Sequence, residues 1–202
     1  MTRLLDRDAV RTAFVAREAP GRALAGDAEA VAAACHAMAM RFHRGGRLLA
    51  FGNGGAATDA AHLAVEFVHP VIVGKRALPA ISLTNNAPAV SGYCGTDAYA
   101  AQLRLFGRPE DIALGVSSSG RCANVDAGLS AAADAGLLTV ALVGRADGAG
   151  PDIAANQAVA HVLTAHAEDP RVVKEVHVTI YHVLWELVHV FLEHPGLLDE
   201  AS

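Results

Sequence analysis

The chain has 202 residues, of which 52% are apolar and 18% charged, with a formal net charge of −5 at pH 7. This balance is typical of a folded globular protein and excludes a disordered one. There is no basic block or basic–aromatic stripe, and the apolar runs are too short for a membrane span, so we expect neither nucleic-acid nor membrane binding. Three scattered cysteines without a CxxC pair, and an N-terminus without a signal-peptide pattern, predict a reduced, cytoplasmic protein.

The first part of the chain predicts helices. Residues 4–18 have an amphipathic pattern, with Leu5, Val10 and Phe14 loosely on one face. Residues 27–44 predict a stronger helix that begins at Asp27 and ends before two glycines. We therefore expect a single domain over residues 1–202, with an N-terminal helical extension over about residues 1–44.

Strands and helices alternate through the rest of the chain. The sequence predicts strands at 47–51, 78–84, 111–116, 137–143 and 158–164, and helices at 56–68, 87–106 (in two pieces), 124–135 and 171–193. Short, nearly all-apolar strands that alternate with helices predict an α/β fold, in which helices cover both faces of a parallel sheet. Ligands in such folds bind beyond the carboxyl ends of the strands.

Two of these strand ends carry polar or glycine-rich loops, Gly52-Asn53-Gly54-Gly55 and Ser117-Ser118-Ser119-Gly120. We expect both loops to lie at one crevice. The serine loop stands between a strand and a helix, and the free N–H groups of a helix N-terminus together with serine hydroxyls favour an anion such as phosphate. A serine-rich turn that only caps the helix explains this loop equally well.

Titratable residues recur on two of the predicted helices. His62 and Glu66 are four residues apart, so they share one helix face and can bind a divalent metal or share a proton, although a surface hydrogen bond is the commoner outcome. His182 lies in the most apolar part of the last helix, where an imidazole needs either a core partner or a ligand. Asp97 opens a helix, and on its own it indicates a cap.

Three segments taken together resemble the SIS (sugar isomerase) domain family, and within it the phosphoheptose isomerase type. They are residues 51–55 with Asp59, His62 and Glu66; residues 116–120 with Asn124; and residues 175–177 with His182. The resemblance extends from about residue 30 to residue 193. It implies a three-layer αβα sandwich with a five-stranded parallel sheet, and a homotetramer with sites at its subunit interfaces.

The resemblance also implies an activity, the conversion of sedoheptulose 7-phosphate into glycero-manno-heptose 7-phosphate through an enediol. Glu66 and His182 would be the two acid/base groups. Zinc would be the cofactor, with His62, Glu66 and His182 as three of its ligands. Contacts to the phosphorylated sugar are expected from Asn53, Gly54, Gly55, Asp97, Ser117, Ser118, Ser119 and Lys174.

This chain departs from the family pattern at five positions. Lys174 replaces a glutamine that is the fourth zinc ligand, and an ammonium cannot coordinate a metal. We therefore hypothesise that the Lys174 ammonium takes the place of the metal and stabilises the enediolate. The other departures are Ala56 and Cys122 in place of phosphate-binding serines, Pro70 in place of an arginine, and Arg171 in place of an aspartate.

These departures leave an alternative from another functional class. A non-catalytic SIS protein would bind a phosphosugar or associate with a replication initiator. That group generally lacks the helix glutamate, so the presence of Glu66 favours the isomerase.

Overall fold

The computed structural model describes residues 6–93, 97–145 and 148–199. Its sheet has five strands, all parallel, in the order β2-β1-β3-β4-β5. The strands are β1 (Leu48–Gly52), β2 (Ala80–Ser82), β3 (Ile112–Ser117), β4 (Leu138–Val143) and β5 (His161–Thr164). The predicted parallel sheet is thus confirmed. The edge strand β2 is shorter than predicted because Pro79 has no N–H for the ladder, and residues 83–85 turn into a 3₁₀ helix.

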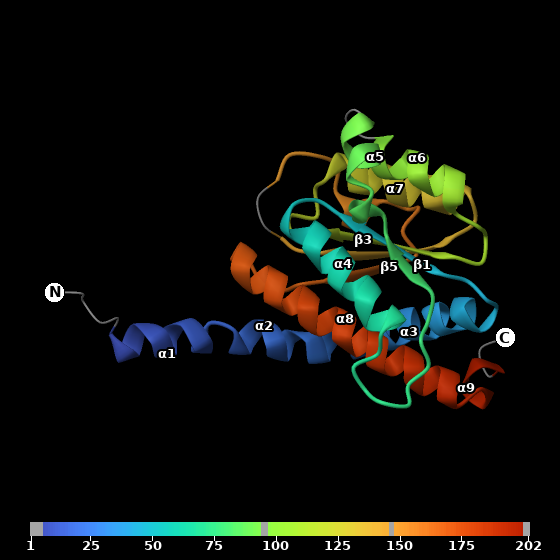
Figure 1. Ribbon diagram of the computed structural model, residues 1–202. Coiled ribbons are helices and arrows are strands. Elements are labelled where there is room, and N and C mark those ends of the chain that lie inside the picture. The colour runs from blue at the N-terminus through green and yellow to red at the C-terminus, as the bar shows by residue number, and fades with distance from the viewer. Residues whose placement is uncertain (1–5, 94–96, 146–147, 200–202) are drawn as a thin grey trace.

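Helices form a layer on each side of this sheet. The helices of the described residues are α1 (Arg7–Val15), α2 (Glu18–Ala23), α3 (Ala28–His43), α4 (Gly55–Val68), α5 (Ala87–Gly92), α6 (Asp97–Phe106), α7 (Ala123–Asp134), α8 (Pro170–Glu193) and α9 (Gly196–Asp199). Helices α3, α4 and α8 cover one face, and α5, α6 and α7 cover the other (Figure 1). The predicted three-layer αβα sandwich is therefore confirmed.

The core consists of two apolar clusters separated by the sheet. Within β1, Leu48 and Ala50 pack toward α3, α4 and α8, whereas Leu49 and Phe51 pack toward α6 and α7. Every residue of β1, β3 and β4 is buried, because both faces of these central strands are covered. The sheet fixes the carboxyl ends of β1 and β3 next to each other, and the two predicted loops follow there.

Of the N-terminal extension predicted over about residues 1–44, α1 and α2 run away from the sandwich in line, whereas α3 packs on the sheet (Figure 1). The helix predicted over residues 4–18 is therefore divided, and Leu5 lies outside the described residues. Helix α1 buries none of its residues, and the side chain of Phe14 is 71% exposed. Both Nε and Nη2 of Arg17 bond to the carboxylate of Glu175, at 2.7 and 2.9 Å, which ties the extension to α8.

The length and hydropathy of the helices also bear on membrane insertion. Over the part of the chain that the structure describes, no helix is long and apolar enough to cross a lipid bilayer.

Candidate active site

The two predicted loops lie side by side at the carboxyl edge of the sheet. Gly52, the last residue of β1, pairs with Val116 of β3. The side chains of Asn53 and Asn124 then exchange two hydrogen bonds. Asn53 Nδ2 donates to Asn124 Oδ1 at 2.6 Å, and Asn124 Nδ2 donates to Asn53 Oδ1 at 2.9 Å. These bonds join the glycine loop to the first turn of the helix that follows the serine loop.

Glycines give these loops their shape. Gly54 has a φ of +53° and Gly120 a φ of +67°, a region of backbone conformation that other residues rarely adopt. A Cβ atom on Gly120 would lie only 2.9 Å from the carbonyl oxygen of Gly144. The turn at Gly54 leads directly into α4, where the N–H groups of Ala56 and Ala57 donate to the carbonyl oxygens of Asn53 and Gly54 at 2.9 and 3.1 Å, so the helix N-terminus lies against the loop.

The serine loop has one buried and two half-buried serines. Ser117 is buried and donates to Cys122 Sγ at 3.2 Å, whereas Ser118 and Ser119 are half-buried. Ser119 Oγ accepts the N–H of Arg121 at 3.2 Å, which leaves the proton of its hydroxyl able to reach a ligand. Beside Ser119 and Gly120 lies a cavity of about 340 Å³ whose walls include Arg121, Arg145 and Asp152, and Arg121 Nη2 lies 3.5 Å from Asp152 Oδ2, so the charge of Arg145 remains without that partner. These hydroxyl and cationic groups suit an anion.

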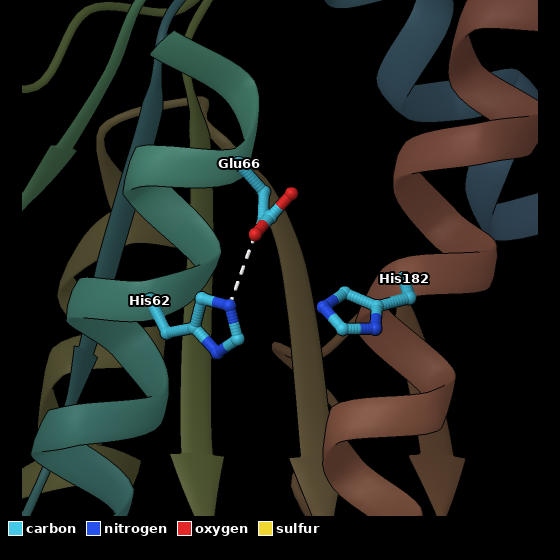
Figure 2. A group of neighbouring side chains, drawn as sticks. All are labelled: His62, Glu66 and His182. Carbon is cyan, nitrogen blue, oxygen red and sulfur yellow. Dashed lines mark hydrogen bonds and ion pairs between the residues drawn. The ribbon is translucent and has the colours of Figure 1, made fainter. Parts of the chain in front are cut away.

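The acid/base residues predicted from the sequence meet between α4 and α8. His62 and Glu66 on α4 point toward His182 on α8 (Figure 2). His62 Nε2 lies 3.0 Å from Glu66 Oε1, and the ring centroids of His62 and His182 are 5.3 Å apart. One ligand atom from each of the three residues lies within 4.8 Å of the other two. The side chain of Glu66 is 12% exposed, so its carboxylate is partly shielded from water.

Tyr181 also belongs to this cluster, although the sequence reasoning did not select it. Its hydroxyl lies 2.6 Å from His62 Nδ1, and its ring contacts both imidazoles edge-on. Burial raises the pKa of Tyr181, so the hydroxyl is neutral over the ordinary pH range. Its position directly before His182 was the available signal, but an aromatic residue in an apolar helix usually indicates core packing.

Lys174 contacts the first two turns of α4. Its ammonium donates to the carbonyl oxygen of Gly55 at 2.8 Å, to Thr58 Oγ1 at 3.2 Å and to Asp59 Oδ1 at 2.6 Å. These three bonds use all the protons of the ammonium group. The ammonium of Lys174, which comes from α8, therefore lies against the first two turns of α4, on the N-terminal side of His62 and beside the buried Asp59 carboxylate.

Contacts between α4 and α8 follow in order along both helices. Asp59 contacts Lys174, His62 contacts Tyr181, and the ring of Phe67 stacks on His189. The two helices therefore run side by side in the same direction, starting from the loop region. Beyond the histidines, a cavity of about 480 Å³ is lined by Glu66, Val71, Ile72, Lys75, His182, Trp185, Glu186 and Val190.

Asp97, the remaining predicted site residue, is the exposed first residue of α6, on the other face of the sheet. Gly95 and Thr96, which belong to the same motif, lie outside the described residues.

The donors of His62, Glu66 and His182 fit a zinc ion. Two imidazoles and one carboxylate are the ligands of catalytic zinc sites that keep one position open. The separation of the donor atoms suits one shared ion, and the Tyr181 hydroxyl supplies the partner that the second nitrogen of a ligating histidine usually has. Lys174 provides no fourth ligand.

Comparisons with known proteins agree on one family. The model of the SIS domain matches residues 16–144. A phosphoheptose isomerase of Solidesulfovibrio magneticus is 40% identical over 82% of this chain and 80% of its own length. Another, from Roseiflexus sp., is 38% identical over 73% of this chain and 74% of its own. The structure of phosphoheptose isomerase from Neisseria gonorrhoeae superposes with a TM-score of 0.79 at 26% identity, covering 90% of this chain and 97% of that one. The chain therefore belongs to the SIS domain family and, within it, to the phosphoheptose isomerases.

Proposed function

We propose that the protein is an aldose–ketose isomerase that converts sedoheptulose 7-phosphate into glycero-manno-heptose 7-phosphate. One observation carries the proposal. A carboxylate on α4 and an imidazole on α8, Glu66 and His182, meet in one cluster, and α4 begins at the glycine loop, which we propose helps to hold the phosphate. The relatives at 32–40% identity are named phosphoheptose isomerase, which supports the same reaction and does not favour a non-catalytic role.

The spacing along α4 suits a seven-carbon substrate. At about 1.5 Å per residue, Gly55 at the loop and His62 in the cluster are about 10 Å apart along the helix. An extended covalent chain advances about 1.2 Å per bond, so phosphorus and C1 of an open-chain heptose 7-phosphate are also about 10 Å apart. A phosphate held at the loops would therefore bring C1 and C2 to the cluster.

The reaction moves protons between neighbouring atoms of the sugar. In the proposed mechanism, Glu66 takes a proton from C1 while the electron pair forms the C1=C2 bond and O2 gains a proton. Return of a proton to C2, with loss of the proton on O1, completes the aldose. His182 would transfer the protons of the two oxygens. Groups in these positions contribute about 10²–10⁴-fold each to such reactions.

The other predicted site residues have supporting roles in the proposal. Asn53, Gly54, Gly55, Asp97, Ser117, Ser118 and Ser119 would contact the sugar or its phosphate. Lys174 would have to exchange one of its three present hydrogen bonds to reach the substrate. Zinc, when bound by His62, Glu66 and His182, supplies a Lewis acid that polarises the carbonyl oxygen.

We further propose a cytoplasmic homotetramer of single-domain subunits with an N-terminal helical extension. The single chain leaves large apolar side chains exposed on α1 and beside the cavity at Glu66, among them Phe14 at 71% and Val73 at 100%. Second copies of the chain that cover these surfaces would remove them from water. Light scattering would then give a mass of four chains.

The test of the proposed reaction is the conversion of purified sedoheptulose 7-phosphate, followed by the appearance of the aldose phosphate. We expect turnover by the wild-type protein and at least a ~100-fold lower kcat for Glu66→Gln, because the base is lost. The matched control is Glu29→Gln, which makes the same change at an exposed position of α3. Thermal stabilisation by the sugar phosphate without turnover would support the non-catalytic alternative instead.

A further inference from the structure

Tyr181 contacts two of the three residues in the proposed catalytic cluster. Its side chain is completely buried on α8. Its ring meets His62 at a centroid distance of 5.3 Å and His182 at 5.0 Å, both nearly perpendicular. Its hydroxyl lies 2.6 Å from His62 Nδ1. The tyrosine therefore forms the inner wall against which both imidazoles rest.

The hydrogen bonds of His62 determine where its proton lies. Its Nε2 is 3.0 Å from Oε1 of Glu66, and an ionised carboxylate only accepts hydrogen bonds, so Nε2 carries the proton. A neutral imidazole has a single N–H, which leaves Nδ1 as an acceptor. The Tyr181 hydroxyl then donates to Nδ1, and a continuous series of bonds runs from Tyr181 through His62 to Glu66.

We propose that Tyr181 is a positioning residue whose hydroxyl fixes the ring orientation and the tautomer of His62. His62 in turn holds Oε1 of Glu66, and the other carboxylate oxygen is turned away from His62 (Figure 2). That second oxygen is the one free to meet a ligand. In the metal-free protein, the base of the proposed reaction is thus aimed by a residue that does not itself reach the substrate.

A hydroxyl also serves the metal-bound state of the same residues. When Nε2 of His62 is a ligand, the proton lies on Nδ1, and the oxygen of Tyr181 can accept a hydrogen bond from Nδ1–H, because a hydroxyl both donates and accepts. A phenylalanine can do neither. If Tyr181 only packed in the core, Tyr181→Phe would leave the His62 tautomer unchanged, since phenylalanine would fill the same space without burying a polar group.

The first experiment reads the tautomer directly and needs neither metal nor substrate. Nitrogen-15 shifts of His62 are measured in the metal-free full-length protein at about pH 8, where an ordinary imidazole is neutral. We expect the Nε2–H tautomer in the wild type and a mixture of tautomers in Tyr181→Phe. The control is Tyr93→Phe, which removes an exposed hydroxyl and should leave the His62 signals unchanged. An identical single tautomer in Tyr181→Phe overturns the proposal.

The second experiment measures Zn²⁺ affinity by competition with a chelator, together with kcat and KM. Loss of such a supporting partner costs about 10–100-fold in metal affinity or activity, so we expect Tyr181→Phe to lower both the Zn²⁺ affinity and kcat while KM changes little. The kcat measurement rests on the proposed function, whereas the tautomer measurement does not. If Tyr181→Phe changes the His62 tautomer while the wild-type protein shows no isomerase activity, the proposed reaction is refuted and the role of Tyr181 stands. Unchanged Zn²⁺ affinity and kcat in Tyr181→Phe would refute that role.

Discussion

The Lys174 ammonium lies 2.6 Å from Oδ1 of Asp59 and so joins the beginning of α8 to the beginning of α4. The carboxylate is buried, with 4% of the Asp59 side chain exposed, whereas 42% of the Lys174 side chain is exposed. The remaining bonds of the ammonium go to Gly55 and Thr58 in the same part of α4. This contact sets the register of the two helices, and His182 reaches Glu66 two turns further along.

Loss of the ammonium should destabilise the protein more than loss of the whole pair. Lys174→Met leaves the buried Asp59 carboxylate without its charged partner, and an unsatisfied buried group costs about 1–3 kcal/mol. The double variant Asp59→Leu/Lys174→Met removes both charges and should regain part of that free energy of unfolding. Urea denaturation of the three proteins measures the difference.

A second ion pair on α8 provides the control for this prediction. Lys75 and Glu193 are 2.7 Å apart, with 49% of the Glu193 side chain exposed. Lys75→Met should cost only about 0–1 kcal/mol, as is usual for pairs that water reaches. Equal losses in Lys174→Met and Lys75→Met would show that the Asp59 pair has no special part in joining the helices.

Ser119 should contribute to phosphate affinity and not to the chemical step. A hydrogen bond to a charged group is worth about 1.5–3 kcal/mol, so Ser119→Ala should weaken binding of the sugar phosphate about tenfold or more while kcat stays near the wild-type value. Thermal-shift titration and steady-state kinetics measure the two effects. The control is Ser130→Ala, which removes an α7 hydroxyl that accepts a hydrogen bond from Asn156 Nδ2 at 3.0 Å. A fall in kcat with unchanged affinity would argue against the phosphate cradle.

Cys122 offers a gain-of-affinity test of the same cradle. Its sulfur lies 3.2 Å from Ser117 Oγ and 3.8 Å from Ser119 Oγ, among the serines of the loop. Cys122→Ser replaces a weak donor by a hydroxyl, and one added bond to an anion should lower KM for the sugar phosphate about tenfold. A KM that rises, or that falls equally for an unphosphorylated sugar, would place the phosphate elsewhere.

His177 should make the protein less stable in mild acid. The residue is completely buried, and burial lowers its pKa, with the Asp59 and Lys174 charges acting in opposite directions. Below about pH 6.5 the unfolded chain therefore binds a proton that the folded chain excludes, so stability falls as the pH falls. As the pH falls from about 7.5 to about 5.5, we expect the free energy of unfolding of His177→Leu to fall by about 1 kcal/mol less than that of the wild type.

Urea midpoints at the two pH values check this prediction. Exposed His43 provides the control, because His43→Gln should keep the wild-type dependence on pH. An equal fall in stability for His177→Leu and the wild type would show that His177 takes no part in it.

The fold could be predicted largely from local patterns. Buried parallel strands require apolar runs on both faces, and glycines end the neighbouring elements, so β1, β3 and β4 begin and end within one residue of the predicted limits. The meeting of His62 and Glu66 followed from their spacing on one helix. Their meeting with His182 on another helix was implied only by the family resemblance.

Other features depend on contacts between distant parts of the chain. Asp59 and Lys174 are 115 residues apart, so the use of all three ammonium protons had no local signal. The Tyr181 hydroxyl reaches His62 only because α4 and α8 pack in one particular register. The exposure of Phe14 likewise reflects the course of α1 away from the sandwich, which an amphipathic pattern does not reveal.

Deuterium incorporation tests the proposed reaction most directly. Sedoheptulose 7-phosphate is incubated in D₂O with the wild type, Glu66→Gln and Glu29→Gln, and both sugar phosphates are then examined by proton NMR. We predict deuterium at C1 of the ketose and C2 of the aldose for the wild type and Glu29→Gln, and at least a ~100-fold slower exchange for Glu66→Gln. Equal exchange in all three proteins would contradict catalysis by Glu66. So would a wild-type protein that the sugar phosphate stabilises against heat but that shows neither deuterium exchange nor aldose.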